Sequence, residues 1–312
     1  MNIQNAKIIY EKLLHNIRKV IKGEPSVIKK LLAAFFSGGH VLLEDVPGTG
    51  KTSLAKTLAQ SIDTDFKRIQ FTPDLLPSDI IGVSIFNQKD GNFHLHKGPI
   101  FANILLTDEL NRANPRTQSA LLEAMAENQV SIDGKILKLE DLFFVVATQN
   151  PIESWGTYPI PESQLDRFML KLHLGYVTRD EEVTILSEHK ISHLKKVEKV
   201  VSISEILEIR KLIQDIKITE ELKYYIVDIV SASRNTEGVL LGSSPRGSIA
   251  LLNSSKALAL FDGIDYVIPD YIQEMAVPAL AHRIVLNSQA KFSGVTSQSI
   301  IKDILARLKT PV

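Results

Sequence analysis

Residues 40–62, with the sequence HVLLEDVPGTGKTSLAKTLAQSI, join a strand pattern to a helix pattern through a glycine-rich turn. The run His40–Asp45 is short and apolar, which is typical of a buried strand, and Lys51–Ile62 carries apolar residues at helical spacing. Glycines at such a junction let backbone N–H groups converge on an anion at the helix N-terminus. The spacing predicts a phosphate-binding loop; the alternative is a glycine turn that merely joins two elements.

Individual residues of this loop have expected roles. Lys51 would reach the β- and γ-phosphates, and the Thr52 hydroxyl would ligate Mg²⁺. The general pattern G-x-x-x-x-G-K-[ST] places a glycine where this chain has Asp45. Aspartate tolerates a left-handed backbone better than most residues, so we expect the turn to be kept.

Two acidic residues follow a second apolar run. In NILLTDEL, Asn103–Leu110, Asp108 and Glu109 come at the predicted carboxyl end of a buried strand. Asp108 can hold Mg²⁺ through water there, and Glu109 can orient or deprotonate an attacking water. A further strand pattern, Leu142–Pro151, leads to Asn150, whose neutral amide could hold that water or contact the γ-phosphate. The alternatives are a pair of solvated acids in a loop and an ordinary Asn-Pro turn.

Two arginines are candidates for the positive charge that phosphoryl transfer needs. Arg167 follows Asp166 at a predicted helix end, and either pairs with that acid or projects to the γ-phosphate of a neighbouring subunit. Arg246 lies in the first turn of a helix that Ser244 is predicted to cap, with Pro245 at its first position. A cation there opposes the helix dipole, and a residue placed against a local preference hints at function.

Buried strand candidates alternate mostly with helical segments in the first part of the chain. This order favours a parallel five-stranded α/β sheet with a nucleotide site at the carboxyl ends of its strands. After Gly175 the pattern changes to helices with clear caps. We predict two domains, a nucleotide-binding core over 1–175 and an all-helical lid over 176–312. The strand candidates are His40–Glu44, Phe66–Phe71, Ile104–Thr107, Phe143–Ala147 and Met169–Leu174.

Composition narrows the function classes. The 312 residues include 36 basic and 36 acidic side chains, so no overall attraction to nucleic acid or an anionic membrane is expected. The absence of cysteine excludes disulfides, thiolate catalysis and cysteine-type zinc sites. The N-terminus lacks the apolar core of a signal peptide, and no apolar run reaches about 18 residues. We therefore expect a cytoplasmic protein.

Six segments occur in the order EDVPGTGKT, LLTDELNRA, TQSALLEAMAE, VVATQNPIE, YPIPESQLDRFML and GSSPRG. Together they resemble the MoxR family of AAA+ ATPases over nearly the whole chain. The Walker elements are shared with many ATPases, whereas DELNRANPRTQSALLEAMAENQV joined to TQNPIESWGTYPIPESQLDRF is more specific. Aspartate at position 45 also fits this resemblance, because similar loops often carry a non-glycine residue there.

The resemblance implies a role for each matching residue, with ATP and Mg²⁺ as cofactors. The nucleotide-binding positions are Pro47, Gly48, Thr49, Gly50, Lys51, Thr52, Ser53 and Asp108, of which Thr52 and Asp108 hold the metal. The catalytic positions are Glu109 of Walker B, Asn150 at sensor 1, Arg167 at the arginine finger and Arg246 at sensor 2. Because the lid arginine and the core lysine come from different domains, their closure on ATP would couple nucleotide state to domain angle.

Two segments have hairpin patterns. Ile80–Phe101 alternates around a turn at 89–91, and Gln129–Asp141 has Asp133-Gly134 at its turn. The resemblance implies a helix-2 insert and a pre-sensor 1 hairpin, which engage clients in related rings. Two stabilising surface hairpins are the alternative.

Several residues carry weaker signals. His94 and His96 share a strand face but lack a third ligand, so we favour exposed strand residues over a metal site. Arg112 either lies at a subunit boundary or pairs with nearby acids. Ile21 and Gly23 occur in a stretch that resembles the one flanking adenine.

The resemblance also implies partners. It indicates a homo-oligomeric ring, often a hexamer, that remodels a client protein, often with a separate von Willebrand factor A domain protein. Two other hypotheses for the function involve the same loop. A small-molecule kinase would require an added phosphate acceptor, and a nucleic-acid motor or loader would bind single strands in a salt-sensitive way.

Overall fold

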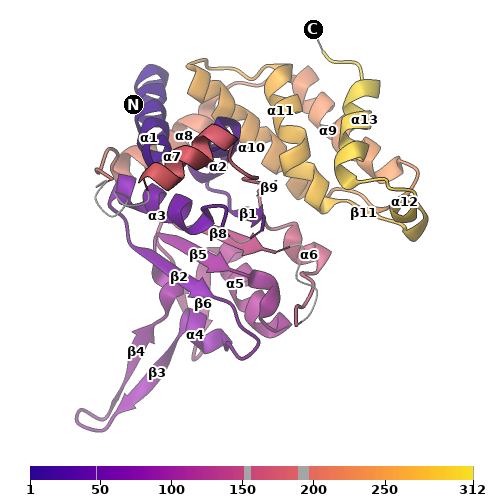
Figure 1. The fold of residues 1–312 in the computed structure, drawn as a ribbon. Helices are drawn as coiled ribbons and strands as arrows, with labels where there is room; N and C mark the ends of the chain where they lie inside the picture. Colours follow the sequence, from indigo (N-terminus) through magenta and orange to yellow (C-terminus); the bar gives the residue numbers. More distant parts are fainter. Residues whose placement is uncertain (47, 151–155, 189–196, 312) are drawn as a thin grey trace.

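The computed structural model describes residues 1–46, 48–150, 156–188 and 197–311. A parallel five-stranded sheet in the order β2-β5-β8-β1-β9 lies at the centre of the core, and a helical lid packs beside it (Figure 1). The strands are β1 (Val41–Glu44), β2 (Phe66–Gln70), β5 (Ile104–Asp108), β8 (Phe144–Gln149) and β9 (Leu170–Leu172). The predicted fold class is confirmed.

Alternation along the central strands creates two apolar cores. Val41 and Leu43 of β1 pack into the core that contains helices α1, α2 and α3, whereas Leu42 packs into the core that contains α5. Successive strand side chains point to opposite faces, so a continuous apolar run is what a sheet covered on both faces requires. The helices are α1 (Ile3–Val20), α2 (Pro25–Phe36), α3 (Lys51–Ile62) and α5 (Pro115–Glu127).

Strand β2 differs from the prediction of a buried strand over Phe66–Phe71. It pairs only with β5, so it is an edge strand, and Lys67, Arg68 and Gln70 are exposed while Ile69 is buried. The apolar residues Phe66, Ile69 and Phe71 suggested burial, but an edge strand has polar residues wherever its side chains meet solvent or a cavity.

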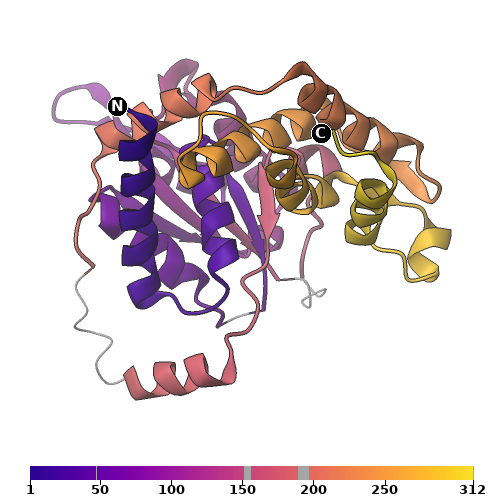
Figure 2. The ribbon, with the colours of Figure 1, turned by 90° about the horizontal axis from the view of Figure 1, so that it is seen from above.

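The helices of the lid come after the last sheet strand in the chain. Helix α7 lies apart from the later lid helices, which gather beside the sheet (Figure 2). Ser244 caps α10 by accepting a hydrogen bond from the Arg246 N–H at 3.1 Å, as predicted. The lid also contains a short antiparallel pair, β10 (Val239–Leu241) and β11 (Val285–Leu286). Its helices are α7 (Arg179–Glu188), α8 (Ile203–Asp215), α9 (Glu220–Asn235), α10 (Pro245–Asp262), α11 (Pro269–Leu280), α12 (Ser288–Phe292) and α13 (Ser297–Arg307).

Both predicted hairpins are present. Strands β3 (Gly82–Asn87) and β4 (Asn92–Lys97) follow the short helix α4 (Pro77–Ile81) and project away from the core (Figure 1). Strands β6 (Gln129–Ile132) and β7 (Lys135–Lys138) turn through Asp133 and Gly134, both with positive φ. Positive φ at two successive residues is what a two-residue hairpin turn requires.

Among the described residues, none of the helices combines the length and the apolar character needed to cross a lipid bilayer.

Candidate functional site

The glycine-rich loop joins β1 to α3, as predicted. Gly50 is the N-cap of α3 with φ 88°, and Gly48 has φ 89°. Both conformations are left-handed, which only glycine adopts readily. A Cβ at either position would meet nothing within 4 Å, so backbone conformation, not crowding, is what requires glycine. The Thr49 hydroxyl donates to the carbonyl of Val46 at 3.3 Å.

A cavity of about 360 Å³ opens beside this loop at the carboxyl edge of the sheet. Eight of the predicted residues line it: Gly48, Gly50, Lys51, Thr52, Ser53, Asp108, Glu109 and Asn150. Pro47, which the resemblance places in the same loop, lies outside the described residues. Three strands, one loop and one helix N-terminus therefore converge at one place, although their residues are far apart in the sequence.

The Lys51 ammonium lies inside the loop. Its Nζ donates to the carbonyl oxygens of Asp45 at 2.6 Å and Val46 at 3.2 Å. Burial lowers the pKa of Lys51 below its ordinary value, while the nearby carboxylates of Asp45, Asp108 and Glu109 act in the opposite direction. A cation held beside free N–H groups of a helix N-terminus is suited to bind the phosphates of a nucleotide.

The two acids at the end of β5 are held differently. Asp108 is buried and accepts a hydrogen bond from the Thr148 hydroxyl of β8 at 3.0 Å. The Glu109 N–H donates to the same Thr148 oxygen at 2.9 Å, and Glu109 has φ 57°. A left-handed backbone at a non-glycine residue is costly and is found most often at functional sites. Thr148 of β8 thus orients the Asp108 carboxylate and the backbone of Glu109.

Strand β2 supplies two residues that the sequence reasoning missed. The Arg68 guanidinium donates from Nε to Asp108 at 2.7 Å and from Nη2 to Gln70 at 3.0 Å. The Gln70 amide donates to Glu109 at 2.6 Å. Arg68 and Gln70 are two apart on a strand and so share a face. That spacing was the available signal, but only the pairing of Gln70 with Asp108 in the sheet register gives it meaning.

Arg112 belongs to the same network. Its Nε lies 3.0 Å from a Glu109 carboxylate oxygen. Of the two roles expected for it, pairing with a nearby acid is the one seen within this chain. Glu109 is therefore held from two sides, by Gln70 and by Arg112.

The donor set suits a hard divalent cation. Thr52 and Asp108 line the same cavity and offer a hydroxyl and a carboxylate oxygen, which are the ligand types that Mg²⁺ prefers. One Asp108 oxygen is paired with Arg68, so the guanidinium and a metal would compete for it. Among the described residues, no group of three or more His, Cys, Asp or Glu forms a metal cluster, and His94 and His96 are exposed on β4.

Asp45 does not need the left-handed backbone expected of it. Its backbone φ is not positive, and its carboxylate is buried. That carboxylate accepts hydrogen bonds from the N–H groups of Leu174 at 2.6 Å and Gly175 at 3.1 Å. The side chain, not the backbone, is what distinguishes aspartate from glycine at this position.

Arg167 and Arg246 lie at a second cavity, of about 240 Å³. It opens near the amino ends of β1 and β9, where His40 and Met169 also line it. Arg167 Nη1 donates to the carbonyl of Leu122 at 2.8 Å. The predicted closure of Arg246 and Lys51 on one nucleotide is not seen within this chain, because the part of the lid that carries Arg246 packs near the amino ends of β1 and β9, whereas the phosphate loop is at the carboxyl edge.

Asp166 joins the core to the lid at this second cavity. It accepts hydrogen bonds from the Ser244 hydroxyl and from Arg283 Nε, both at 2.9 Å, and lies 3.7 Å from Arg246 Nη1. The expected alternative, in which Arg167 pairs with its own Asp166, does not describe these contacts.

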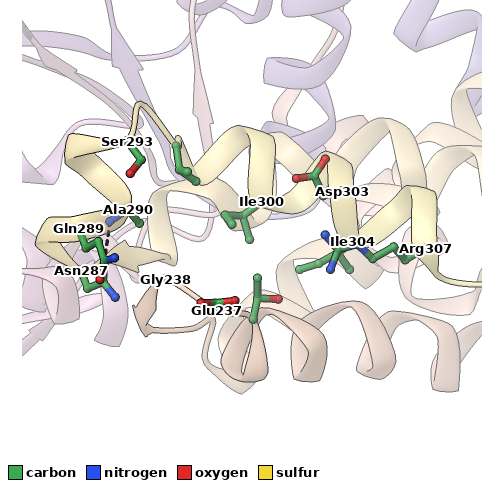
Figure 3. Close-up of a pocket in the computed structure, with 12 residues that line it drawn as sticks. Glu237, Gly238, Asn287, Gln289, Ala290, Ser293, Ile300, Asp303, Ile304 and Arg307 are labelled. Carbon is green, nitrogen blue, oxygen red and sulfur yellow. Dashed lines mark hydrogen bonds between the residues drawn. The ribbon is translucent and has the colours of Figure 1, made fainter.

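A third cavity, of about 380 Å³, lies within the lid between the end of α9 and helices α12 and α13 (Figure 3). Glu237, Asp303 and Arg307 surround an apolar floor that includes Ile300 and Ile304. None of the predicted site residues lines it, so it is separate from the cavity beside the glycine-rich loop.

Comparisons with known proteins agree with this geometry. Residues 40–170 match the model of the ATPase family associated with various cellular activities (AAA), and residues 231–304 match the AAA lid domain. YeaC, an uncharacterized protein of Bacillus subtilis, is 49% identical over 96% of this chain and 94% of its own length. Chaperone MoxR1 of Mycobacterium tuberculosis is 37% identical over 96% of this chain and 82% of its own length.

A solved structure extends the likeness to three dimensions. The crystal structure of an inferred ATPase from Cytophaga hutchinsonii superposes with a TM-score of 0.91 at 42% identity, over 99% of this chain and 97% of that one. The phosphate loop, the paired acids of β5, the helical lid and these relatives lead to one conclusion: the chain belongs to the MoxR family of AAA+ ATPases.

Proposed function

We propose that this protein binds ATP with Mg²⁺ in the cavity beside the glycine-rich loop and hydrolyses it. The observation that carries the proposal is the convergence of Lys51, Thr52, Asp108, Glu109 and Asn150 on one cavity of about 360 Å³. A cation, two metal ligands, a candidate base and a neutral amide are the groups that phosphoryl transfer to water needs.

Each residue has a distinct task in this proposal. The N–H groups of the loop from Gly48 to Ser53 and the Lys51 ammonium bind the β- and γ-phosphates. Thr52 and Asp108 hold Mg²⁺, which would neutralise charge on the phosphate oxygens. Pro47 keeps the loop role that the resemblance gives it.

Glu109 activates the attacking water. Its carboxylate accepts the proton, and the Asn150 amide keeps the water in line with the γ-phosphate. Gln70 and Arg112 occupy the Glu109 carboxylate within this chain, so one or both must release it before it can act as a base.

A neighbouring subunit completes the site. Arg167 and Arg246 line one cavity at the amino edge of the sheet, whereas the phosphates bind at the carboxyl edge. Two arginines on the opposite edge can reach a γ-phosphate only in the next subunit of a ring. This supports a homo-oligomeric ring, with a hexamer as the proposed form.

Remodelling of a client protein is the proposed output. The relative from Mycobacterium tuberculosis is called a chaperone, which favours a chaperone-like role here. The β3–β4 and β6–β7 hairpins would contact the client, and a separate von Willebrand factor A domain protein would act as a partner. We also propose that the domain boundary lies at 175/176, just after the last sheet strand.

Replacement of Glu109 tests the hydrolysis mechanism. Glu109→Gln should bind Mg²⁺-ATP as tightly as the natural protein but lose turnover by about 100-fold or more, because a general base contributes roughly that factor. Binding is measured with a fluorescent ATP analogue and turnover by phosphate release. Normal turnover in this variant would remove Glu109 from the mechanism.

A mixing experiment tests the shared site. Lys51→Ala and Arg167→Ala should each be inactive alone. A mixture of the two should recover part of the activity, because some interfaces then combine an intact loop with an intact arginine. Absence of rescue at every ratio, with both variants still assembling, would argue against an arginine supplied in trans.

A further inference from the structure

The residue that departs from the usual loop pattern carries our inference. Position 45 is a glycine in the general phosphate-loop pattern, and glycine has no side chain with which to bind anything. Here it is an aspartate whose carboxylate is buried, with the residue 8% exposed. A buried carboxylate costs free energy unless it is hydrogen-bonded, so its partners indicate why it is there.

Its partners lie 129 and 130 residues further along the chain. The carboxylate accepts the N–H of Leu174 at 2.6 Å with one oxygen and the N–H of Gly175 at 3.1 Å with the other. These two residues follow β9, where the chain leaves the sheet toward α7 and the lid. Gly175 has φ 69°, a left-handed conformation that glycine adopts readily, so the chain turns directly after the two N–H groups.

The same aspartate is bound to the phosphate loop from its other side. Its carbonyl oxygen accepts the Lys51 ammonium at 2.6 Å. Phosphate oxygens at the loop would compete for those ammonium protons, because lysine has three donors and no acceptor. One residue therefore contacts both the lysine that reaches the phosphates and the exit from the sheet.

A second carboxylate binds another part of residues 174–178, which we call the exit segment. Glu181 of α7 accepts the N–H groups of Gly23 at 3.0 Å and Thr178 at 2.9 Å. Gly23 is in the stretch that we associate with adenine. The exit segment thus has one contact near the expected position of the phosphates, through Asp45, and one near the expected position of the adenine base, through Glu181.

We propose that Asp45 is a positioning residue that couples the phosphate loop to the exit segment 174–178. Its carboxylate fixes the two N–H groups of that segment, and its carbonyl responds when Lys51 turns to a bound phosphate. The inference rests on the proposed function, because it assigns a regulatory link to that same site. A chain with glycine at this position would keep the loop and lose the link.

Hydrogen exchange measured by mass spectrometry tests this coupling. Without nucleotide, the amides of Leu174 and Gly175 should exchange at least about 10-fold faster in Asp45→Asn and Asp45→Gly than in the natural protein, since losing a hydrogen bond of about 1.5 kcal/mol or more corresponds to that factor. Asparagine keeps one acceptor and presents an N–H₂ to the other donor. Glycine is the residue of the general pattern, so this second variant is expected to fold.

The second comparison measures how a bound nucleotide analogue changes the exchange of the exit segment. With Mg²⁺ and a non-hydrolysable ATP analogue, exchange in 174–178 should change several-fold in the natural protein and not in either Asp45 variant. The melting temperature is recorded in parallel, since a merely structural brace would lower it and leave the nucleotide response intact. Equal exit-segment responses in all three proteins would overturn the inference.

Glu181→Gln is the matched control. It removes a carboxylate that also accepts two backbone N–H groups, that of Thr178 in the exit segment and that of Gly23 outside it, and its described partners do not include the phosphate loop, so the response at 174 and 175 should persist. Loss of that response in Glu181→Gln would also overturn the inference. Protection of the loop peptide 48–58 by the analogue reports on the proposed ATP site alone. Its absence would contradict the proposed function, while the comparison without nucleotide would still decide whether Asp45 holds the exit segment.

Discussion

At the scale of single residues, two carboxylates of the site are held in place by cations and by hydrogen-bond donors. Asp108 pairs with Arg68, and Glu109 pairs with Arg112 and Gln70. Both acids would be needed elsewhere during catalysis, one for the metal and one for water. Their present partners therefore compete with the proposed chemistry.

Arg68 gives the first prediction. Its guanidinium is about half exposed and occupies an Asp108 oxygen at 2.7 Å. Arg68→Ala should lower the Mg²⁺ concentration needed for half-maximal ATP binding several-fold, because the metal no longer displaces a cation. The measurement is a Mg²⁺ titration of analogue binding by fluorescence.

Lys67→Ala is the control for Arg68. Lys67 is the preceding residue on β2, so it points to the opposite face, where it lies 4.0 Å from Asp65. Its removal should leave the Mg²⁺ titration unchanged. A higher Mg²⁺ requirement in Arg68→Ala would mean that Arg68 assists nucleotide binding.

At the scale of secondary structure elements, His40 connects the start of β1 to its neighbours. Its ring Nδ1 accepts the Val145 N–H of β8 at 3.0 Å, and its Nε2 donates to the carbonyl of Met125 in α5 at 3.2 Å. Only the neutral ring can make both bonds. Burial lowers the pKa of His40 to about 4.

The second prediction concerns pH. Between the folded pKa of about 4 and the usual unfolded value near 6.5, the unfolded chain binds more protons than the folded one. The contribution of His40 to stability is therefore full above about pH 6.5 and falls as pH decreases toward 4, by about 2 kcal/mol at pH 5. The stability difference between the natural protein and His40→Gln, measured by urea denaturation, should shift by that amount from pH 7 to pH 5. A pH-independent difference would contradict the buried neutral ring.

The β3–β4 hairpin is an element without a core of its own. The rings of Phe86 and Phe93 pair in a tilted arrangement, 5.2 Å apart between centroids, yet they are 50% and 71% exposed and belong to neither apolar core. A two-stranded hairpin whose large apolar side chains lie outside both cores is marginally stable, so its stability is separable from that of the core.

The third prediction follows from this separation. Phe86→Ser combined with Phe93→Ser should change the free energy of unfolding by less than about 1 kcal/mol. Phe71→Ala, which truncates a fully buried ring at the end of β2, should cost about 3–5 kcal/mol. Denaturant unfolding compares them. A large loss in the hairpin variant would mean that the hairpin packs against the core in solution.

At the scale of the whole molecule, a buried ion pair joins lid and core. The Arg283 side chain is 2% exposed and bonds to Asp166 as well as to the carbonyl oxygens of Met169 and Phe168. Ser244 and Arg246 of α10 reach the same Asp166. Arg167 follows directly, so the arginine proposed to act in trans is carried on this joint.

The fourth prediction is that Asp166→Asn destabilises the protein by about 3–5 kcal/mol, because it leaves the Arg283 charge buried and unpaired. Asp265→Asn is the matched control. It breaks a pair with Lys217 of similar length, 2.8 Å, whose side chains are 49% and 76% exposed, and should cost much less stability because solvent screens an exposed pair. Thermal denaturation of both variants tests the difference. Equal losses would show that the joint contributes no more than a surface pair.

Local pattern was enough to predict most of the fold and most of the residues that line the cavity beside the glycine-rich loop. The strand before Gly48, the helix after Gly50, the acids that end β5 and both hairpin turns depend on residues close together in the sequence, so periodicity and turn chemistry predicted them. The edge position of β2 was not predictable in this way, because exposure of a strand depends on which strands lie beside it.

The sequence by itself determined the glycine-rich loop between a strand and a helix, the alternation of strands and helices, and the family resemblance, because each depends on residues at short spacing. Only the tertiary structure decided that Arg68 and Gln70 reach the acids of β5, that Asp45 binds the exit from β9, and that Arg167 and Arg246 meet at the opposite edge of the sheet from Lys51. The physical reason is that these contacts join segments tens of residues or more apart. Strand order, register and the packing of the lid bring them together, and no local pattern specifies those.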